Sequence, residues 1–468
     1  KLFQLQLAMK LNFLVFVLEV YTILILLFEV ALPGADIINE TPKRKLAVSF
    51  LPLLITILSK YIEGWSFVTF PALICSTTIP IGTIMEGIPK LGFGVLVSML
   101  AIAHLKSLRS YPIKGLLEPT GPLRVGSKLF KEKGHPIFSV YYPTTSPTTK
   151  FPKFIPDNDA HKKYREIAQG NTNFPPGWLL DIMTHFCTKL NIKASVDAPL
   201  VTEEKLKTST NHTKFVPLIF SHGLGASRNH YSSLLCQLAS QGYFIISMDH
   251  QDNVKEMFSA FEKYTTKYLD MRVKEVLQTI EDLCSETGLI RSMFGEQIEF
   301  DMSRLTVMGH SFGGATAYRA ASEDSRVKNC VLLDPWLAAI PKETLDGRLN
   351  CNLLMLESWD WNERTPESEI TKNNLRVMEA QRDNEFGALY CKVPNSQHNH
   401  FSDDVLVVGG VLKALKLIND IESSIEVHKS CIQMLDNYCA TVVARKQTSD
   451  YFMLYQSDEK FPLVKYAQ

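Results

Sequence analysis

The sequence predicts an α/β fold, a mostly parallel sheet with flanking helices, preceded by an α-helical transmembrane module. Three observations lead to this prediction. The first 110 residues contain four long apolar stretches, whereas the remainder alternates short β-branched strands with helical periodicity. A Gly-x-Ser-x-Gly sequence, Gly309 to Gly313, stands between one such strand and one such helix. With 468 residues the chain has room for two or three domains of about 100–200 residues each.

The composition excludes several classes of protein. Lys and Arg together number 49, as do Asp and Glu, so the chain lacks the basic excess of a nucleic-acid-binding protein, and no nucleic-acid partner is expected. With 46% hydrophobic and 21% charged residues, it is not disordered as a whole. Residues 1–110 hold nine basic and six acidic side chains, so the remainder is slightly acidic and the two parts differ in character.

The N-terminal part reads as a membrane module. Its first apolar stretch, residues 11–32, matches the about 20 residues that cross a bilayer, and it exceeds the about 7–15 residues of a signal-peptide core. Further apolar stretches follow at 46–58, 65–85 and 91–105. We therefore expect three or four membrane elements and an integral membrane protein, with the organelle undetermined.

The C-terminal part alternates strands and helices. Apolar residues recur at helical spacing over 267–283. Short β-branched strands separated by helices are typical of a parallel sheet, whose chemistry lies at the carboxyl ends of its strands. The strands that the pattern predicts are 136–142, 216–221, 242–248, 304–308, 327–333, 352–356 and 388–393.

Ser311 is the predicted nucleophile. It lies between a strand and a helix-forming run, 315–321, and Gly309 and Gly313 flank it in the turn. A tight turn with small residues on both sides lifts the serine hydroxyl above the sheet, as in the nucleophile elbow of the α/β-hydrolase fold. The N-terminus of the following helix directs free N–H groups toward a developing oxyanion.

The backbone amides of Leu224 and Phe312 are the predicted oxyanion-hole donors. Phe312 follows the nucleophile, and Leu224 lies in a glycine-containing loop after the strand 216–221. His222 lies in the same loop but precedes Ser311, whereas in this fold the acid and the histidine follow the serine. We therefore interpret His222 as structural.

The histidine and the acid are not decided by spacing. His398 and His400 both lie in a polar loop after the strand 388–393, where the histidine belongs. Asp334 ends one strand, while Glu357 and Asp360 follow the next.

Several motifs together resemble a known family, the lipoprotein-associated platelet-activating-factor acetylhydrolases. The resemblance covers about residues 119–415. The motifs are 309–316 (GHSFGGAT), 220–225 (FSHGLG), Leu333-Asp334-x-Trp336, Ser396-x-His398-x-x-Phe401, 120–126 (TGPLRVG) leading to 141–143 (YYP), and 322–324 (SED).

The resemblance implies Asp334 as the acid, His398 as the histidine, and Leu224 and Phe312 as oxyanion donors. It also implies a calcium-independent serine esterase that removes short or oxidised acyl groups from the sn-2 position of phospholipids, with no metal or other cofactor. The family commonly has Glu-His-Arg-Asp where this chain has Asp249-His250-Gln251-Asp252, so local ion pairing is expected to differ.

A helix predicted over 177–190 lies where the resembled family has a membrane-contacting helix. Large apolar side chains recur there at helical spacing, which suits a lipid surface and suits a core equally well. The residues of this candidate lipid-facing helix are Trp178, Leu179, Ile182, Met183 and Phe186.

The predicted organisation has three parts: a multi-span anchor at 1–110, a catalytic domain at 111–425 and a C-terminal extension at 426–468. The expected substrate is a phospholipid ester. Two alternatives remain from the sequence: an acyltransferase on the same scaffold, or an accessory subunit of a membrane complex that retains a hydrolase domain and binds partner subunits.

Overall fold

The chain of the computed structural model divides into two units, Lys1–Ile113 with His185–Lys189 and Lys114–Thr184 with Leu190–Gln468, and the described residues other than Cys187 belong to the second. The predicted anchor (1–110), the predicted lipid-facing helix and most of the predicted C-terminal extension lie outside the described residues. The description covers residues 115–443 except 133–134, 156–186, 188–189, 211, 254–255, 257–260, 296–297, 360–368, 383–385, 410–411 and 413–417.

A nine-stranded sheet forms the centre, with the order β3-β1-β2-β5-β4-β6-β7-β8-β9. The six strands from β5 to β9 in this order are parallel, whereas β2 is antiparallel to both β1 and β5. The strands are β1 Arg124–Phe130, β2 Ile137–Thr144, β3 Ser195–Val196, β4 Val216–Ser221, β5 Tyr243–Asp249, β6 Thr306–His310, β7 Asn329–Leu333, β8 Asn352–Ser358 and β9 Ala388–Val393.

This is the sheet of an α/β-hydrolase, so the predicted fold class is confirmed for the described residues. All seven predicted strands are present, and two of them, β4 and β9, have the predicted bounds. The antiparallel edge of the sheet was not predicted. Gly126 interrupts the strand-like pattern of β1, and the ring of Tyr142 covers it: a Cβ at Gly126 would lie 2.5 Å from that ring.

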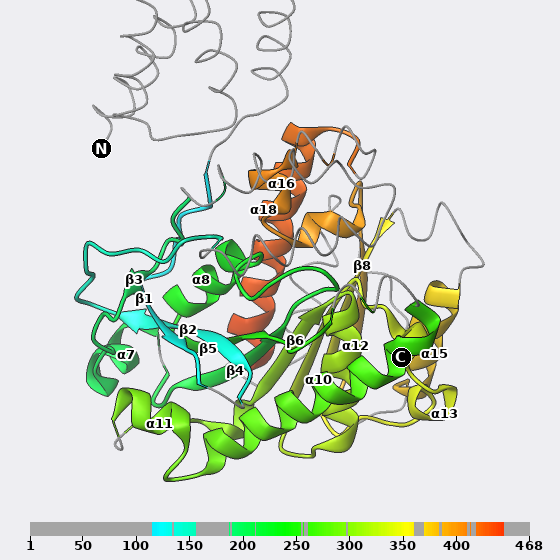
Figure 1. The fold of residues 1–468 in the computed structure, drawn as a ribbon, viewed down its shortest axis with the longest axis horizontal. Coiled ribbons are helices and arrows are strands. Elements are labelled where there is room, and N and C mark those ends of the chain that lie inside the picture. Colours follow the sequence, from blue (N-terminus) through cyan, green and yellow to red (C-terminus); the bar gives the residue numbers. More distant parts are fainter. Residues whose placement is uncertain are drawn as a thin grey trace, which may run out of the picture. The chain divides into compact units, whose positions relative to one another are not determined.

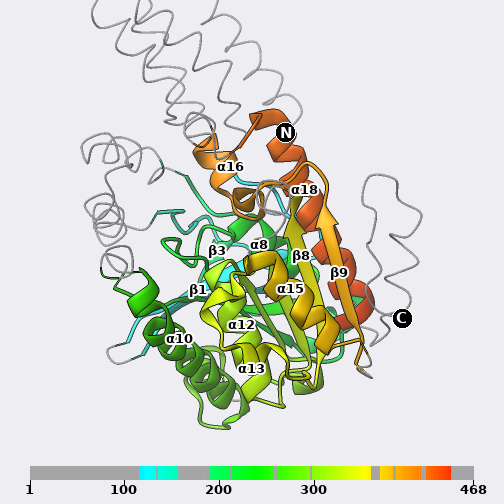
Figure 2. The ribbon, with the colours of Figure 1, turned by 90° about the vertical axis from the view of Figure 1, so that its right-hand side faces the viewer.

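Helices cover both faces of the sheet (Figures 1 and 2). On one face α12 packs on β4, β6 and β7, and α10 packs on α12; on the other, α8 packs on β1, β2 and β5, and α18 packs on α8. The longer helices are α7 Glu203–Thr210, α8 Ser232–Ser240, α10 Phe261–Cys284, α11 Leu289–Phe294, α12 Phe312–Glu323, α15 Glu369–Ala380 and α18 Ile421–Tyr438; α13 Lys342–Leu345, α16 Asp404–Val407 and the 3₁₀ turn η4 His398–Phe401 are short.

The apolar core lies between the sheet and these helices. Val273, Val276 and Ile280, which share one side of α10, are buried against it, as the helical spacing predicted. On the other side, α18 crosses residue 425, where the sequence placed the end of the catalytic domain. Within the described part of the chain, no helix combines the length and the apolar character that a membrane crossing requires.

Candidate active site

Ser311 lies in a sharp turn between β6 and α12. Its backbone has φ 57° and ψ −119°, a conformation that non-glycine residues seldom adopt. Its N–H donates to the carbonyl oxygen of Leu333 at 2.9 Å, which ties the turn to the end of the neighbouring strand β7. The turn therefore holds the serine at the carboxyl edge of the sheet.

The two elbow glycines leave no space for a side chain. A Cβ at Gly309 would lie 2.0 Å from the carbonyl oxygen of Gly313. A Cβ at Gly313 would lie 2.1 Å from the carbonyl oxygen of Ser221, in strand β4. Because backbone atoms cannot move aside cheaply, both positions require glycine for the turn to pack against the sheet.

Asp334 and His398 lie together at the same edge. Nδ1 of His398 donates to Oδ2 of Asp334 at 2.6 Å, and the carboxylate is fully buried. Ser358, at the end of β8, donates to both carboxylate oxygens at 2.7 Å, through its N–H and its hydroxyl. The ring of His310, the residue before Ser311, packs on that of His398 with centroids 4.5 Å apart. The aspartate is thus fixed, and the histidine lies beside the elbow.

The competing histidine has other partners. Nδ1 of His400 accepts from the N–H of Gln397 at 2.9 Å, and its Nε2 bonds the Ser424 hydroxyl at 2.7 Å. Burial lowers the pKa of His400 to about 4, so the ring is neutral near pH 7. These contacts connect the loop of His398 to α18.

Glu357, one of the two competing acids, has hydrogen-bond partners on other elements. Oε2 of Glu357 accepts hydrogen bonds from Tyr390 at 2.5 Å and Asn374 at 2.8 Å. Its side chain is buried, and burial raises its pKa. Asp360 lies outside the described residues.

The loop of residues 222–225, here called the oxyanion loop after its predicted role, lies against Ser311. A Cβ at Gly223 would be 3.4 Å from Cβ of Ser311. The N–H of Gly223 donates to the Tyr231 hydroxyl at 3.2 Å and is therefore engaged within the protein. The next amide along the loop is that of Leu224, the predicted oxyanion donor. Phe312 is the first residue of α12, where the N–H has no partner within the helix.

His222 makes backbone contacts on both ring nitrogens. Its Nδ1 donates to the carbonyl oxygen of Gly223 at 2.7 Å, and its Nε2 accepts from the N–H of His250 at 3.4 Å. The side chain is fully buried. These contacts stabilise the oxyanion loop, in keeping with the structural interpretation of His222.

Arg272 was missed by the sequence reasoning. It is fully buried on α10, donates to the carbonyl oxygen of His222 at 2.6 Å, and lies 4.7 Å above the ring of Phe312. Asp252, also buried, accepts from its guanidinium at 3.0 and 3.1 Å. Arg272 therefore contacts both segments that carry the predicted oxyanion donors. The sequence contains one sign of this role, because Arg272 is a charged residue on the otherwise apolar face of a predicted helix.

The ion pairs at 249–252 supply the local pairing that the sequence left undefined. The carboxylate of Asp249 forms an ion pair with the Arg228 guanidinium, and it also accepts a hydrogen bond from the backbone N–H of Arg228 at 2.8 Å. His250 bonds Glu275 at 2.6 Å through Nδ1 and the Ser221 hydroxyl at 2.7 Å through Nε2. These buried contacts join β5, α10 and the end of β4 beneath the oxyanion loop.

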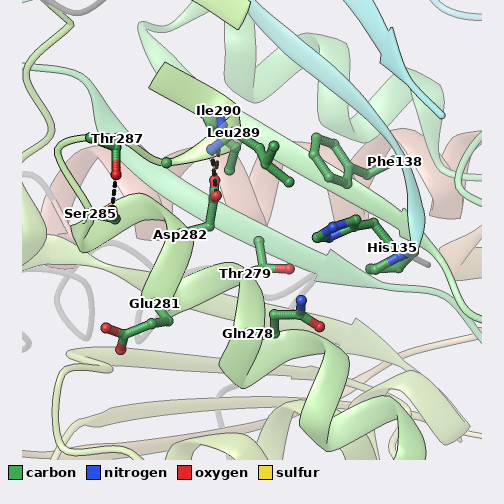
Figure 3. A pocket seen from close by; sticks show the side chains of 12 residues that line it. His135, Phe138, Gln278, Thr279, Glu281, Asp282, Ser285, Thr287, Leu289 and Ile290 are labelled. Carbon is green, nitrogen blue, oxygen red and sulfur yellow. Dashed lines mark hydrogen bonds between the residues drawn. The ribbon is translucent and has the colours of Figure 1, made fainter. Parts of the chain in front are cut away.

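A hollow of about 360 Å³ lies elsewhere on the unit (Figure 3). It is lined by residues from the start of β2, the end of α10 and the start of α11, among them Phe138 and Asp282. Both carboxylate oxygens of Asp282 accept backbone N–H groups, from Leu289 and Ile290. None of the predicted site residues lines this hollow. Within the described residues, no group of three or more His, Cys, Asp or Glu side chains could hold a metal ion.

The sequence pattern of one family, described as platelet-activating factor acetylhydrolase, isoform II, matches residues 111–291 and 276–448. The match covers well over half of the chain. The protein belongs to the platelet-activating factor acetylhydrolase isoform II family. The name of this family describes a carboxylic ester hydrolase, and platelet-activating factor is a phospholipid.

Curated relatives agree with this membership. A platelet-activating factor acetylhydrolase of Gallus gallus is 26% identical over 253 residues, covering 45% of this chain and 58% of its own. One of Cavia porcellus is 26% identical over 280 residues, covering 52% of this chain and 61% of its own. The chain thus spans about three fifths of the length of these relatives.

A solved structure has the same fold. The ferulic acid esterase from Streptomyces cinnamoneus superposes with a TM-score of 0.52 at 16% sequence identity, covering 75% of this chain and 99% of the esterase. This likeness supports the α/β-hydrolase fold of the acetylhydrolase family member described here.

Proposed function

We propose that this protein is a membrane-anchored serine esterase that hydrolyses the sn-2 acyl ester of phospholipids with short or oxidised acyl chains. The observation that carries the proposal is the hydrogen bond between Asp334 and His398, next to the elbow that bears Ser311. Membership of the acetylhydrolase family supports the phospholipid ester as substrate.

In the proposed reaction, Oγ of Ser311 attacks the ester carbonyl carbon while Nε2 of His398 takes the hydroxyl proton. Asp334 holds the imidazole through Nδ1 and stabilises its protonated form. The amides of Leu224 and Phe312 bind the oxyanion, and each such donor contributes about 2.7–4 kcal/mol in other enzymes.

The tetrahedral intermediate collapses when the bond to the glycerol oxygen breaks and His398 returns the proton to that oxygen. This step releases a lysophospholipid and leaves an acyl group on Ser311. Water, deprotonated by His398, then attacks the acyl-enzyme and releases the free acid. These steps use only groups of the chain and water.

The membrane anchorage in this proposal rests on the apolar stretches of residues 1–110, which lie outside the described residues. An anchor of this kind would hold the esterase beside its lipid substrate. Extraction of native membranes with alkaline carbonate tests it: an anchored protein stays in the pellet, and release into the supernatant would contradict it.

The esterase is tested with the full chain in mild detergent. A fluorophosphonate probe should label the wild type and the Ser322→Ala variant but not Ser311→Ala; Ser322 is an exposed serine of α12, the helix that follows Ser311. Phosphatidylcholines with sn-2 chains from acetyl to palmitoyl should be hydrolysed more slowly as the chain lengthens. Labelling that persists in Ser311→Ala would contradict the proposed nucleophile.

A further inference from the structure

Three hydrogen bonds form a buried chain from the oxyanion loop to the loop of His398. The N–H of Gly223 bonds the Tyr231 hydroxyl at 3.2 Å, and that hydroxyl bonds Nδ1 of His310 at 2.8 Å. Nε2 of His310 bonds the carbonyl oxygen of His398 at 3.0 Å. Both Tyr231 and His310 are at most 5% exposed.

The direction of every bond in this chain is fixed by chemistry. A carbonyl oxygen only accepts, so Nε2 of His310 carries a proton and donates it to His398. A neutral imidazole has one N–H, so Nδ1 accepts and the Tyr231 hydroxyl is the donor. The phenol oxygen in turn accepts from Gly223. Burial is the main cause that lowers the pKa of His310 well below its usual value, and the charge of the nearby His398 is a smaller one. The ring is therefore kept neutral.

The same residues fill the space between the two loops. The rings of Tyr231 and His310 have centroids 5.5 Å apart, and His310 packs on His398 at 4.5 Å. A Cβ at Gly223 would lie 3.1 Å from both Nδ1 of His310 and the Tyr231 hydroxyl. The oxyanion loop is thus held by packing as well as by hydrogen bonds.

We propose that Tyr231 and His310 are positioning residues that hold the oxyanion loop and the His398 loop at a fixed separation across Ser311. The inference rests on the proposed function, because it matters only if one loop binds the oxyanion and the other carries the base. A displacement of about 1 Å in such a group can cost on the order of 100-fold in rate.

Two variants interrupt the chain without emptying the space. Tyr231→Phe keeps the ring and removes the hydroxyl, which leaves Gly223 N–H and His310 Nδ1 without their bonds. His310→Gln keeps an amide N–H that can donate to the His398 carbonyl oxygen, but it removes the rigid ring that holds the donor and the acceptor for Tyr231 in fixed positions. Tyr142→Phe is the matched control. The buried Tyr142 hydroxyl donates at 2.7 Å to the carbonyl oxygen of Ala198, and neither residue takes part in the three hydrogen bonds described above.

The measurement is kcat per active site, with sites of the full-length protein counted by fluorophosphonate titration and an sn-2 acetyl phosphatidylcholine as substrate. Tyr231→Phe is expected to lower kcat per titrated site by about 10- to 100-fold, with KM changed less than about twofold. His310→Gln is expected to lower it in the same direction, and it decides the question if Tyr231→Phe does not fold. Tyr142→Phe should match the wild type per site.

A residue with a merely structural role would reduce the number of titrated sites and leave kcat per site unchanged. That result for both Tyr231→Phe and His310→Gln would overturn the inference while leaving the esterase proposal intact. A wild-type protein whose Ser311 reacts with no probe would overturn the proposed function, and the inference with it.

Discussion

Asp334 accepts a hydrogen bond of 2.6 Å from Nδ1 of His398, across 64 residues of sequence. This bond fixes the tautomer of the ring, because a proton on Nδ1 leaves Nε2 to act as the acceptor. Ser358 completes the set by donating to both carboxylate oxygens. The carboxylate therefore has little freedom to turn away from the histidine.

Asp334→Asn is expected to lower kcat by about 10³- to 10⁴-fold with little change in KM, because the amide stabilises the wrong imidazole tautomer. Glu357 is a neighbouring buried carboxyl whose hydrogen bonds go to Tyr390 and Asn374. The kcat of Glu357→Gln should therefore stay within about tenfold of the wild-type value. Steady-state kinetics on both variants test this. A crippled Glu357→Gln beside an active Asp334→Asn would reverse the assignment of the acid.

Arg272→Met should destabilise the protein and lower the rate per titrated site. The substitution leaves the carboxylate of Asp252 buried without its partner, and breaking such a pair typically costs about 3–5 kcal/mol. It also removes the hydrogen bond to the His222 carbonyl. Urea unfolding gives the first quantity and titrated kinetics the second.

Arg376→Met is the control for Arg272→Met, since Arg376 forms an exposed ion pair with Asp346 and exposed pairs contribute little. If Arg272→Met were as stable as Arg376→Met, the buried ion pair between Arg272 and Asp252 would not stabilise the fold.

Gly309→Ala should prevent the elbow from forming, because the added methyl group would lie 2.0 Å from a backbone carbonyl oxygen. We expect little or no folded protein and no probe labelling. Gly409→Ala is the matched control: its Cβ would meet Ile421 at 3.4 Å, an ordinary contact. Expression level and circular dichroism distinguish the two, and a folded, active Gly309→Ala would contradict the described turn.

Stability should fall as the pH is lowered from about 6.5 to 4. Burial, and to a smaller extent the charge of Arg304, lowers the pKa of His212 to about 4. The unfolded chain therefore binds a proton in this pH range that the folded chain does not. Each such proton contributes a slope of about 1.4 kcal/mol per pH unit, and folding stability rises with pH.

His212→Asn should flatten that slope of unfolding free energy against pH by up to one proton. His135→Asn is the control, because the His135 ring lies near the surface. Urea midpoints at pH 4, 5, 6 and 7 provide the measurement. If unfolding free energy changes with pH equally in both variants, the pKa of His212 is not lowered by folding.

Much of the site followed from local pattern. The strand before Ser311 and the helix after it were visible because hydrophobic periodicity changes at the elbow. Arg272 could have been found as a charge on an apolar helix face. Tyr231 gave no such signal, since a tyrosine near a helix start is ordinary until the fold brings His310 against it.

The sequence by itself determined the α/β class, the parallel strands and the strand-turn-helix segment around Ser311, because these depend on residues that are close together along the chain. Only the tertiary structure showed which of His398 and His400 meets Asp334, and where Glu357, Arg272 and Tyr231 find their partners. The physical reason is separation: these hydrogen bonds join residues 24 to 79 positions apart, so strand order, register and burial decide them.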